Sequence, residues 1–236
     1  MRCILTAGWE DGIADLTQCL ARELSAGKKV LWLLSGGSNI PASVEVMDKI
    51  SADLSQNLSV SLIDERFGKE GHPDSNWTKL LAAGFDIKKG QLLPPLQADL
   101  TFDQTVDRYE KIIRDGRKNN QIIIAQLGIG DDGHVAGILP DSPAALERTD
   151  LICGYQSQPF LRLTTTFPAL KSMDIVYAFA FGSNKQPALV DLQSKKISPI
   201  KQPAQILKQI PSAFVYSDQI GDTKWPNKTA PSSNRP

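Results

Sequence analysis

The sequence is poor in histidine and cysteine, and this scarcity limits the chemistry that it can perform. Its 236 residues include two histidines, His72 and His134, and three cysteines, Cys3, Cys19 and Cys153, with no CxxC pair. Thiols this few and scattered exclude a disulfide framework and fit a reducing compartment. They also give no zinc-ligand spacing, so we expect no metal site. Any histidine catalysis must come from one of two residues.

Net charge and long hydrophobic runs are also absent. The 26 Lys and Arg residues balance 26 Asp and Glu, which argues against nucleic acid or an anionic membrane as the main partner. The longest apolar runs, such as Val30–Leu34 and Ile175–Phe181, fall far short of the ~20 residues that span a bilayer. The first residues lack the long apolar segment and cleavage site of a secretion signal. We therefore expect a cytoplasmic protein that binds neither nucleic acid nor membrane.

What the sequence does contain is a core-forming share of apolar residues, 41%, arranged largely in short runs. Several are continuously apolar, which is typical of strands covered on both faces of a parallel sheet. Strand–helix alternation predicts an α/β fold with a mostly parallel sheet. The predicted strands are Arg2–Ala7, Val30–Leu34, Leu58–Ile63, Ile122–Leu127, Leu161–Thr165, Ile175–Phe181 and Ala213–Tyr216.

Helices are predicted between these strands by apolar residues at spacings of three and four. Two such faces consist of Ile13, Leu16, Leu20 and Leu24, and of Phe102, Val106, Tyr109 and Ile113. Thr101 and Gln104 form a capping box before the second, and Pro41 suits the first turn of a helix over Ala42–Leu54. We expect one domain over residues 1–221. Residues 222–236, rich in Pro, Asn and Ser, are expected to form a flexible tail.

Three predicted strands end in loops rich in functional side chains, and ligands of open α/β sheets bind at such carboxyl ends. The first loop runs from Ser35 to Pro41 and contains Ser35-Gly36-Gly37-Ser38. Paired glycines let backbone N–H groups approach a ligand. With hydroxyls and a helix N-terminus they make an anion site, of which phosphate is the usual occupant. The loop lacks Walker A spacing, and an ordinary tight turn is the alternative interpretation.

The second loop is Asp64-Glu65-Arg66-Phe67, after the strand Leu58–Ile63. These charges could simply be solvated, but the guanidinium of Arg66 offers a fork of donors that matches phosphate or carboxylate. Downstream, Asp74 or Ser75 is expected to cap a helix.

The third loop, Gly128-Ile129-Gly130-Asp131-Asp132-Gly133-His134, follows the strand Ile122–Leu127 and contains the pattern GxGxxG. A dinucleotide site is the wrong interpretation, because Asp131 and Asp132 would face the pyrophosphate with negative charge. The strand is also not the first of the chain, and Pro140 soon follows.

His134 is instead predicted to act as a general base, since a neutral imidazole suits that role near neutral pH. Asp132 could fix its tautomer and orientation, as the carboxylate of a catalytic triad does. The alternative is a buried structural histidine. His72 lies in a polar stretch and is expected to be an exposed loop residue without function. No GxSxG pattern is present, so a base that activates water is favoured over covalent catalysis.

These three loops, in this order and spacing, resemble the 6-phosphogluconolactonase family, which is related to the glucosamine-6-phosphate deaminases. The matching segments are Ser35–Ser38, Asp64–Arg66, Ser75-Asn76, Gly128–His134 and Pro140-Asp141, with weaker matches at Arg162–Thr164, Pro168–Leu170, Gly182, Lys185 and Pro203-Ala204. The resemblance implies a three-layer αβα fold with a Rossmann-like sheet. It also implies hydrolysis of 6-phospho-glucono-δ-lactone, a pentose phosphate pathway reaction, without metal or other cofactor.

The resemblance further implies roles for individual residues. His134 would activate water and Asp132 would orient it. The 6-phosphate would be held by Ser35, Gly36, Gly37 and Ser38 with the cations Arg66, Arg162 and Lys185, and the further site candidates are Asp64, Asn76, Gly130 and Gly133. The expected partner is a small sugar phosphate, and the chain is expected to be a monomer or a small homo-oligomer.

The sequence departs from the lactonase pattern at a few positions. Asp131 stands where lactonases commonly have Pro, Val135 where they often have Thr, and Asn39-Ile40 replaces the more usual Thr before Pro41. None of these changes removes a proposed catalytic group. A second carboxylate at position 131 could alter the pKa of His134 or the fit of the substrate.

Two rival functions remain. Glucosamine-6-phosphate deaminases carry Asn-Glu-Pro after the histidine loop and usually Asp-Glu-Tyr at the strand end, where this chain has Ile138-Leu139-Pro140 and Asp64-Glu65-Arg66. Both differences favour the lactonase. A non-catalytic sugar-phosphate-binding protein would keep the anion loop and Arg66 and could lose the base, so the intact Asp132-Gly133-His134 unit argues against it.

Overall fold

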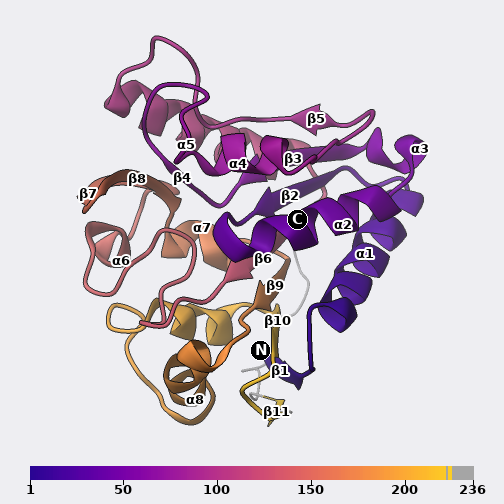
Figure 1. Cartoon of the computed structure of the whole chain (residues 1–236). Helices are drawn as coiled ribbons and strands as arrows, with labels where there is room; N and C mark the ends of the chain where they lie inside the picture. The colour runs from indigo at the N-terminus through magenta and orange to yellow at the C-terminus, as the bar shows by residue number, and fades with distance from the viewer. Residues whose placement is uncertain (222, 225–236) are drawn as a thin grey trace, which may run out of the picture.

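An eight-stranded sheet runs through the middle of the molecule and is parallel except for the edge strand β11 (Figure 1). The computed structural model describes residues 1–221 and 223–224. In spatial order the strands are β11 (Thr223–Lys224), β1 (Arg2–Leu5), β10 (Ser212–Ser217), β9 (Ile175–Phe179), β6 (Ile122–Gly128), β2 (Val30–Leu34), β3 (Leu58–Leu62) and β5 (Gln91–Leu92).

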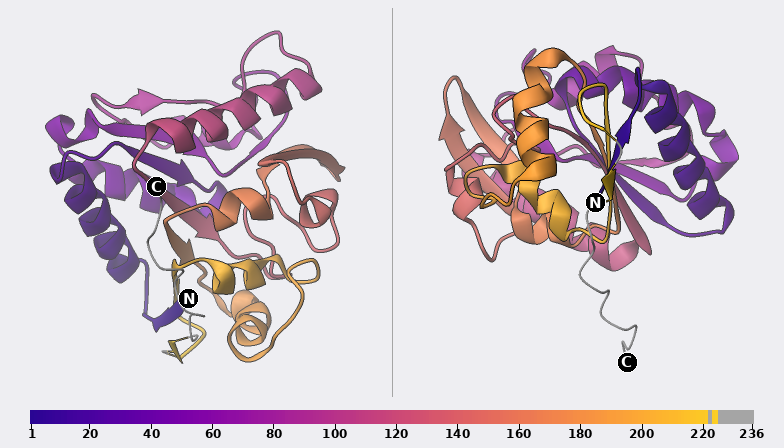
Figure 2. Two further views of the ribbon diagram at one scale, coloured as in Figure 1. Left: turned by 180° about the vertical axis from the view of Figure 1, so that it is seen from behind. Right: turned by 90° about the horizontal axis from the view of Figure 1, so that it is seen from below.

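Helices cover both faces of this sheet, as the view from below shows (Figure 2). One face packs against α1 (Glu10–Ser25) and α2 (Ile40–Lys49), and the other against α5 (Phe102–Asn119), α7 (Phe167–Lys171) and α8 (Gln186–Ser194). The shorter helices are α3 (Ala52–Ser55), α4 (Asn76–Ala82), α6 (Pro143–Leu146), η1 (Gly37–Asn39), η2 (Ser183–Lys185) and η3 (Pro203–Gln209). This arrangement confirms the predicted three-layer α/β fold.

Strand β2 shows why several strands consist of apolar residues at every position. Successive side chains of a strand point to opposite faces. Val30, Trp32 and Leu34 therefore join the core beneath α1 and α2, while Leu31 and Leu33 join the core beneath α5. All five are buried, so each face of the sheet requires its own apolar residues.

The direction in which the chain crosses the sheet reverses at β2. From β2 the next strands, β3 and β5, lie progressively to one side, and the chain then returns to β6 on the other side of β2 and continues to β9 and β10. Loops leaving the carboxyl ends of β2 and β6 consequently diverge. In open α/β sheets this switch point is the usual ligand crevice.

A second, three-stranded antiparallel sheet lies beside the first. It has the order β4 (Asp64–Arg66), β8 (Phe160–Thr165) and β7 (Ile152–Ser157). The predicted strand Leu161–Thr165 therefore forms, but it belongs to this separate sheet rather than to the parallel one. Strands β4 and β7 are additional to the predicted set, as are the short edge strands β5 and β11.

The helix expected over Ala42–Leu54 is shorter than predicted. Helix α2 has Pro41 in its first turn, as expected, but ends at Lys49. The Ser51 hydroxyl accepts a hydrogen bond from the Leu54 amide and so begins the separate helix α3. A serine that caps a new helix competes with continuation of the old one. The helix predicted from the apolar face of Phe102, Val106, Tyr109 and Ile113 forms as α5, and it begins with the predicted capping box of Thr101 and Gln104.

The tail expected over residues 222–236 lies outside the described residues except for Thr223–Lys224, which pair with β1. No helix within residues 1–221 and 223–224 is both long enough and apolar enough to cross a membrane.

Candidate active site

A cavity of about 250 Å³ opens at the carboxyl ends of β2 and β6, at the switch point of the sheet. This volume is below that of a typical drug-sized site and suits a small ligand. A larger depression, about 660 Å³, lies at the amino ends of the strands, between α5 and the beginnings of β3 and β5. We assign the site to the smaller cavity, because ligands of parallel sheets bind at carboxyl ends and the three functional loops meet there.

The cavity brings together most of the predicted site residues. Those that line it are Ser35, Gly36, Gly37, Ser38, Asp64, Arg66, Asn76, Gly130, His134, Arg162 and Lys185. Asp132 and Gly133 do not line it. The carboxylate of Asp132 contacts Nδ1 of His134. Gly133 lies in the turn of the loop with a φ of 79°.

The loop after β2 supplies one wall of the cavity and leads into the N-terminus of α2 through η1. The first N–H groups of a helix have no partner within the helix, so they are available to an anion. Gly36 is required here by close approach, because a Cβ at this position would lie 2.0 Å from Oδ1 of Asn76. The contact places Asn76, from α4, directly against the glycine loop.

Asn39 fastens this loop to the central strand β6. Its backbone carbonyl accepts hydrogen bonds from the side-chain amide of Gln126 at 3.1 Å and from the Ser43 hydroxyl at 3.2 Å. Its own side-chain oxygen Oδ1 is buried, as is Oδ1 of Asn76, and neither has a hydrogen-bond partner within the described part of the chain. Buried acceptors without partners are rare in folded proteins. Both belong to residues that line the same cavity.

His134 and Asp132 form the pair predicted from the third loop. Nδ1 of His134 lies 2.7 Å from Oδ1 of Asp132, which also accepts the backbone N–H of His134 at 2.9 Å. Partial burial alone would raise the pKa of Asp132, but the hydrogen bonds from His134 outweigh it and hold that pKa below its ordinary value. In a neutral imidazole, an ionised Asp132 at this place favours the tautomer that carries its proton on Nδ1 and leaves Nε2 unprotonated.

A tight turn creates this pair. The amide of Gly130 donates to the carbonyl of His134 at 2.9 Å, and the amide of Gly133 donates to the carbonyl of Gly130 at 3.1 Å. A Cβ on Gly130 would lie 2.0 Å from Nδ1 of His134 and 2.7 Å from Oδ1 of Asp132. Only glycine allows the ring and the carboxylate to meet over this backbone.

The small antiparallel sheet forms a second wall of the cavity and carries two cations. Arg66 on β4 is the direct cross-strand neighbour of Arg162 on β8, and Asp64 is the neighbour of Thr164. Directly paired residues point to the same face of a sheet. Arg66, Arg162 and Asp64 therefore all reach the cavity from one face of the sheet.

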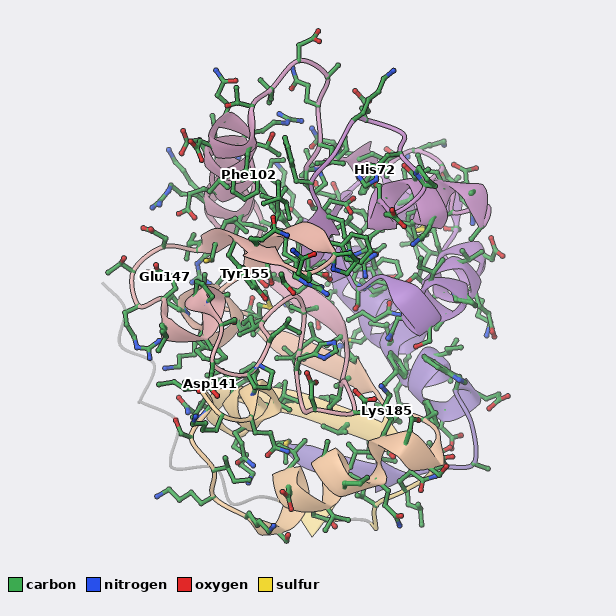
Figure 3. The ribbon with its side chains drawn as sticks, turned by 60° about the vertical axis from the view of Figure 1, so that its left-hand side comes forward. His72, Phe102, Asp141, Glu147, Tyr155 and Lys185 are labelled. Atoms are coloured by element: carbon green, nitrogen blue, oxygen red, sulfur yellow. The ribbon has the colours of Figure 1, made fainter. Side chains whose placement is uncertain are left out.

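Lys185 approaches from the opposite side, where η2 leads into α8. Figure 3 shows it below and to the right of Tyr155 of the small sheet. Tyr155 fixes the chain beyond the histidine loop, since its hydroxyl donates to the carbonyl of Gly137 at 2.5 Å. Two arginines and a lysine therefore line a single small cavity, which gives it a positive potential suited to an anion.

Asp64 is the one carboxylate of the described residues that lines the cavity. It is 5% exposed and has no cation within ion-pair distance in the described part of the chain. Burial raises the pKa of Asp64, and the more distant positive charges of Arg66, Arg162 and His134 oppose the rise. The Asn76 side-chain amide also donates to Asp64 Oδ2, at 3.4 Å. A buried carboxylate with a raised pKa beside a cavity is a candidate functional group.

Glu65, the next residue, is fully buried and points away from the cavity. Its carboxylate accepts the backbone N–H groups of Arg66 and Asn76 at 2.7 Å each, that of Trp77 at 3.0 Å, and the Ser75 hydroxyl at 2.8 Å. Burial raises the pKa of Glu65, and these four donors oppose the rise. Glu65 therefore joins β4 to the start of α4, which fixes Arg66 and Asn76 relative to each other.

Several expectations about neighbouring residues are settled by the structure. Ser75 caps α4, as one of the two predicted alternatives, by accepting the amide of Thr78. His72 lies in a loop, as expected, but it is half-buried instead of exposed, and its Nε2 lies 3.0 Å from the carbonyl oxygen of Arg66. It does not line the cavity. Val135 is buried in the core, and Asp131 is exposed outside the cavity lining, so neither departure reaches the site directly.

The cavity also contains residues that the sequence analysis did not assign to it, including Asn39, Ala136 and Phe179–Phe181. Asn39 lies within the first functional loop, so its amide was a usable signal. Phe179–Phe181 are the last three residues of the predicted strand Ile175–Phe181, but apolar side chains there carry no chemical signature.

Together, the fold and the cavity define a three-layer α/β protein in which a histidine, paired with an aspartate, and a group of cations lie around one small cavity. Within residues 1–221 and 223–224, no three His, Cys, Asp or Glu side chains are grouped closely enough to hold a metal ion.

Comparison with known proteins places this chain in a family. A family model described as glucosamine-6-phosphate isomerases/6-phosphogluconolactonase matches residues 9–225, and the chain belongs to that family. The resemblance stated from the three loops is thereby confirmed.

Both branches of the family are represented among its relatives. The chain is 32% identical over 214 residues to the Oryza sativa subsp. indica protein named Probable 6-phosphogluconolactonase 4, chloroplastic, covering 80% of this chain and 64% of the rice protein. It is 27% identical over 240 residues to the glucosamine-6-phosphate deaminase of Lactobacillus johnsonii, covering 95% and 97% of the two chains. The crystal structure of 6-phosphogluconolactonase from Thermotoga maritima is similar in fold, with a TM-score of 0.73 at 19% identity over 91% of this chain and 97% of that one.

Proposed function

We propose that this protein hydrolyses 6-phospho-glucono-δ-lactone to 6-phosphogluconate, with His134 as the general base. The observation that carries the proposal is the geometry of one small cavity. A histidine whose Nδ1 is hydrogen-bonded to a carboxylate at 2.7 Å lines the same 250 Å³ space as Arg66, Arg162 and Lys185. A base and an anion-binding group in one small space are what hydrolysis of a phosphorylated lactone requires.

The proposed reaction begins when Nε2 of His134 removes a proton from water as the oxygen attacks the lactone carbonyl carbon. Asp132 stabilises the imidazolium that forms, through the hydrogen bond to Nδ1. The tetrahedral intermediate then collapses, the bond from the carbonyl carbon to the ring oxygen breaks, and the imidazolium returns its proton to that oxygen. The product is the open-chain acid, which ionises at neutral pH. General-base assistance of this kind contributes roughly 10²- to 10⁴-fold to the rate.

The phosphate of the substrate would lie between the glycine loop and the small sheet. Arg66 and Arg162 offer planar guanidinium groups suited to phosphate oxygens, and Ser35–Ser38 offers backbone and hydroxyl donors before α2. Lys185 adds a point charge from the other side. Holding the phosphate fixes the lactone carbonyl relative to His134, and such positioning adds to the chemical assistance.

Deamination of glucosamine 6-phosphate is the nearest alternative, because the family includes such enzymes and one is similar over nearly the whole chain. The positions after the histidine loop argue against it. Ile138 is fully buried and apolar where the deaminase pattern has a polar residue, and Leu139 replaces the acidic one. The site therefore has no carboxylate at that position to assist ring opening.

Purified protein mixed with fresh 6-phosphogluconolactone tests the proposal by proton release in a stopped-flow instrument, with the buffer blank subtracted. We expect release well above the blank. Ammonia released from glucosamine 6-phosphate would favour the deaminase instead. Calorimetric binding of 6-phosphogluconate without either reaction would identify a sugar-phosphate-binding protein. The cytoplasmic location and the small oligomeric state stay predictions of the sequence.

A further inference from the structure

The two arginines of the cavity share a single aromatic ring. The Cζ atoms of Arg66 and Arg162 lie 5.1 Å and 6.0 Å from the centroid of the Phe160 ring. Phe160 begins β8, two residues before Arg162, and residues two apart on a strand point to the same face. The ring and both guanidinium groups therefore belong to the face of the small sheet that borders the cavity.

This pairing needs an explanation, because like charges directly opposite each other destabilise an antiparallel sheet. Little else holds the two side chains. One Nη of Arg66 donates to the carbonyl of Asp74 at 3.0 Å. The Nε of Arg66 and that of Arg162 are both buried, and neither has a hydrogen-bond partner among the residues that the structure describes.

An aromatic ring can orient two arginines without using their N–H donors, which a hydrogen-bond acceptor cannot do. The face of a ring attracts a cation through its quadrupole and does not occupy any N–H donor. A carboxylate in the same place would orient the arginines but would compete with an anionic ligand for their donors and cancel their charge. A ring leaves two oriented guanidinium groups with donors free for the ligand.

The hairpin that carries the ring is itself fixed. Phe160 pairs with Ser157 across the β7–β8 turn, and its carbonyl accepts the side-chain amide of Gln156 at 3.2 Å. The ring therefore has a defined position relative to Arg162 on its own strand and to Arg66 on the neighbouring one.

We propose that Phe160 is a positioning residue that aligns Arg66 and Arg162 for the phosphate of the substrate while leaving their donors free. The proposal rests on the proposed function, since it assigns the anion at the arginine pair to the phosphate of that substrate. Phe160 itself need not touch the reacting atoms.

The test compares Phe160→Leu, which keeps apolar bulk, with Phe160→Tyr, which keeps the ring. We expect Phe160→Leu to raise KM for 6-phosphogluconolactone about 5- to 30-fold, from two weakened cation–ring contacts, with kcat and its pH profile unchanged. Phe160→Tyr should restore KM to within about twofold. For gluconolactone without the phosphate, Phe160→Leu should leave kcat/KM as in the wild type.

Phe102 provides the matched control. It lies at the start of α5 against the other face of the same sheet, where a Cβ on Gly154 would contact its ring, and it stacks edge-on with Phe67 at 5.2 Å. Figure 3 shows it above Tyr155. We expect Phe102→Leu to lower the thermal stability and to leave KM unchanged. An equal rise of KM in both variants, or an equal loss for both lactones in Phe160→Leu, would mean that the ring acts only as a structural support.

A second readout separates this proposal from the proposed reaction. The Kd of 6-phosphogluconate, measured by calorimetry, should rise by the same 5- to 30-fold in Phe160→Leu even if the wild type hydrolyses no lactone. A raised Kd in Phe160→Leu, together with no hydrolysis by the wild type, would refute the proposed reaction and support the role of the ring. An unchanged Kd, or no binding by the wild type, would overturn the role of the ring.

Discussion

Glu65→Gln is a one-atom change with consequences that follow from the contacts of the carboxylate. Oε1 accepts the amides of Arg66 and Asn76, and Oε2 accepts the amide of Trp77 and the Ser75 hydroxyl. An NH₂ group placed at Oε1 would face two N–H donors. Placed at Oε2 it would still face the Trp77 amide, although the Ser75 hydroxyl could rotate to accept.

The less damaging orientation therefore leaves at least one buried backbone N–H without an acceptor and replaces charged acceptors by a neutral one. We expect the free energy of unfolding to fall by about 2–4 kcal/mol. Since Glu65 holds β4 against α4, Arg66 and Asn76 should also lose their alignment, and KM for the lactone should rise several-fold.

Urea unfolding followed by fluorescence, together with steady-state kinetics, measures both effects. Glu110→Gln is the matched control, because Glu110 also accepts two backbone amides, those of Leu151 and Ile152 at 2.9 and 2.7 Å, and none of these residues lines the cavity. It should lose stability without a change in KM. A Glu65→Gln protein within 0.5 kcal/mol of the wild type, or with an unchanged KM, would refute the role assigned to Glu65.

Three further variants probe the cavity. Burial raises the folded pKa of Asp64 above its unfolded value, so the stability linked to Asp64 is fully present below the unfolded pKa and is lost as pH rises through the folded pKa. Asp64→Asn should therefore be more stable than the wild type near pH 7, by roughly 0.5–2 kcal/mol, with the difference vanishing in urea titrations near pH 3. Gly130→Ala should reduce kcat more than tenfold because its Cβ would displace His134. Gly221→Ala should be silent, because its Cβ would meet nothing within 4 Å in the part of the chain that the structure describes. Asp132→Asn should lower kcat roughly 10- to 100-fold with little change in KM, through loss of the charge that fixes the His134 tautomer.

The parallel strands could be predicted because their cause is local. Val30–Leu34 and Ile122–Leu127 are apolar at every position or nearly so, and only a strand covered on both faces needs that pattern. The capping box at Thr101 is equally local, since its two partners are three residues apart.

The small sheet depends on distant partners and could not be predicted as a whole. Strand β4 consists of three charged residues, Asp64–Arg66, whose extended form is fixed by pairing with β8 about a hundred residues later. Strand β7 contains Gly154, a residue depleted in strands. Gly154 is suited to its place because any Cβ would meet Val106 and Phe102 of α5.

The site was predictable by residue type and not by arrangement. Glycines, His134 and Arg66 at strand ends indicate chemistry, and parallel topology brings those ends together. The pairing of Arg66 with Arg162 requires the antiparallel register of β4 and β8, and the ring of Phe160 becomes relevant only when that register is known.

The most direct test of the central claim compares wild type with His134→Asn on fresh 6-phosphogluconolactone by stopped-flow proton release. The account predicts that kcat falls by roughly 10²- to 10⁴-fold while the Kd of 6-phosphogluconate stays within about twofold, because the arginine pair and the glycine loop are intact. A His134→Asn protein that releases protons at the wild-type rate would contradict it.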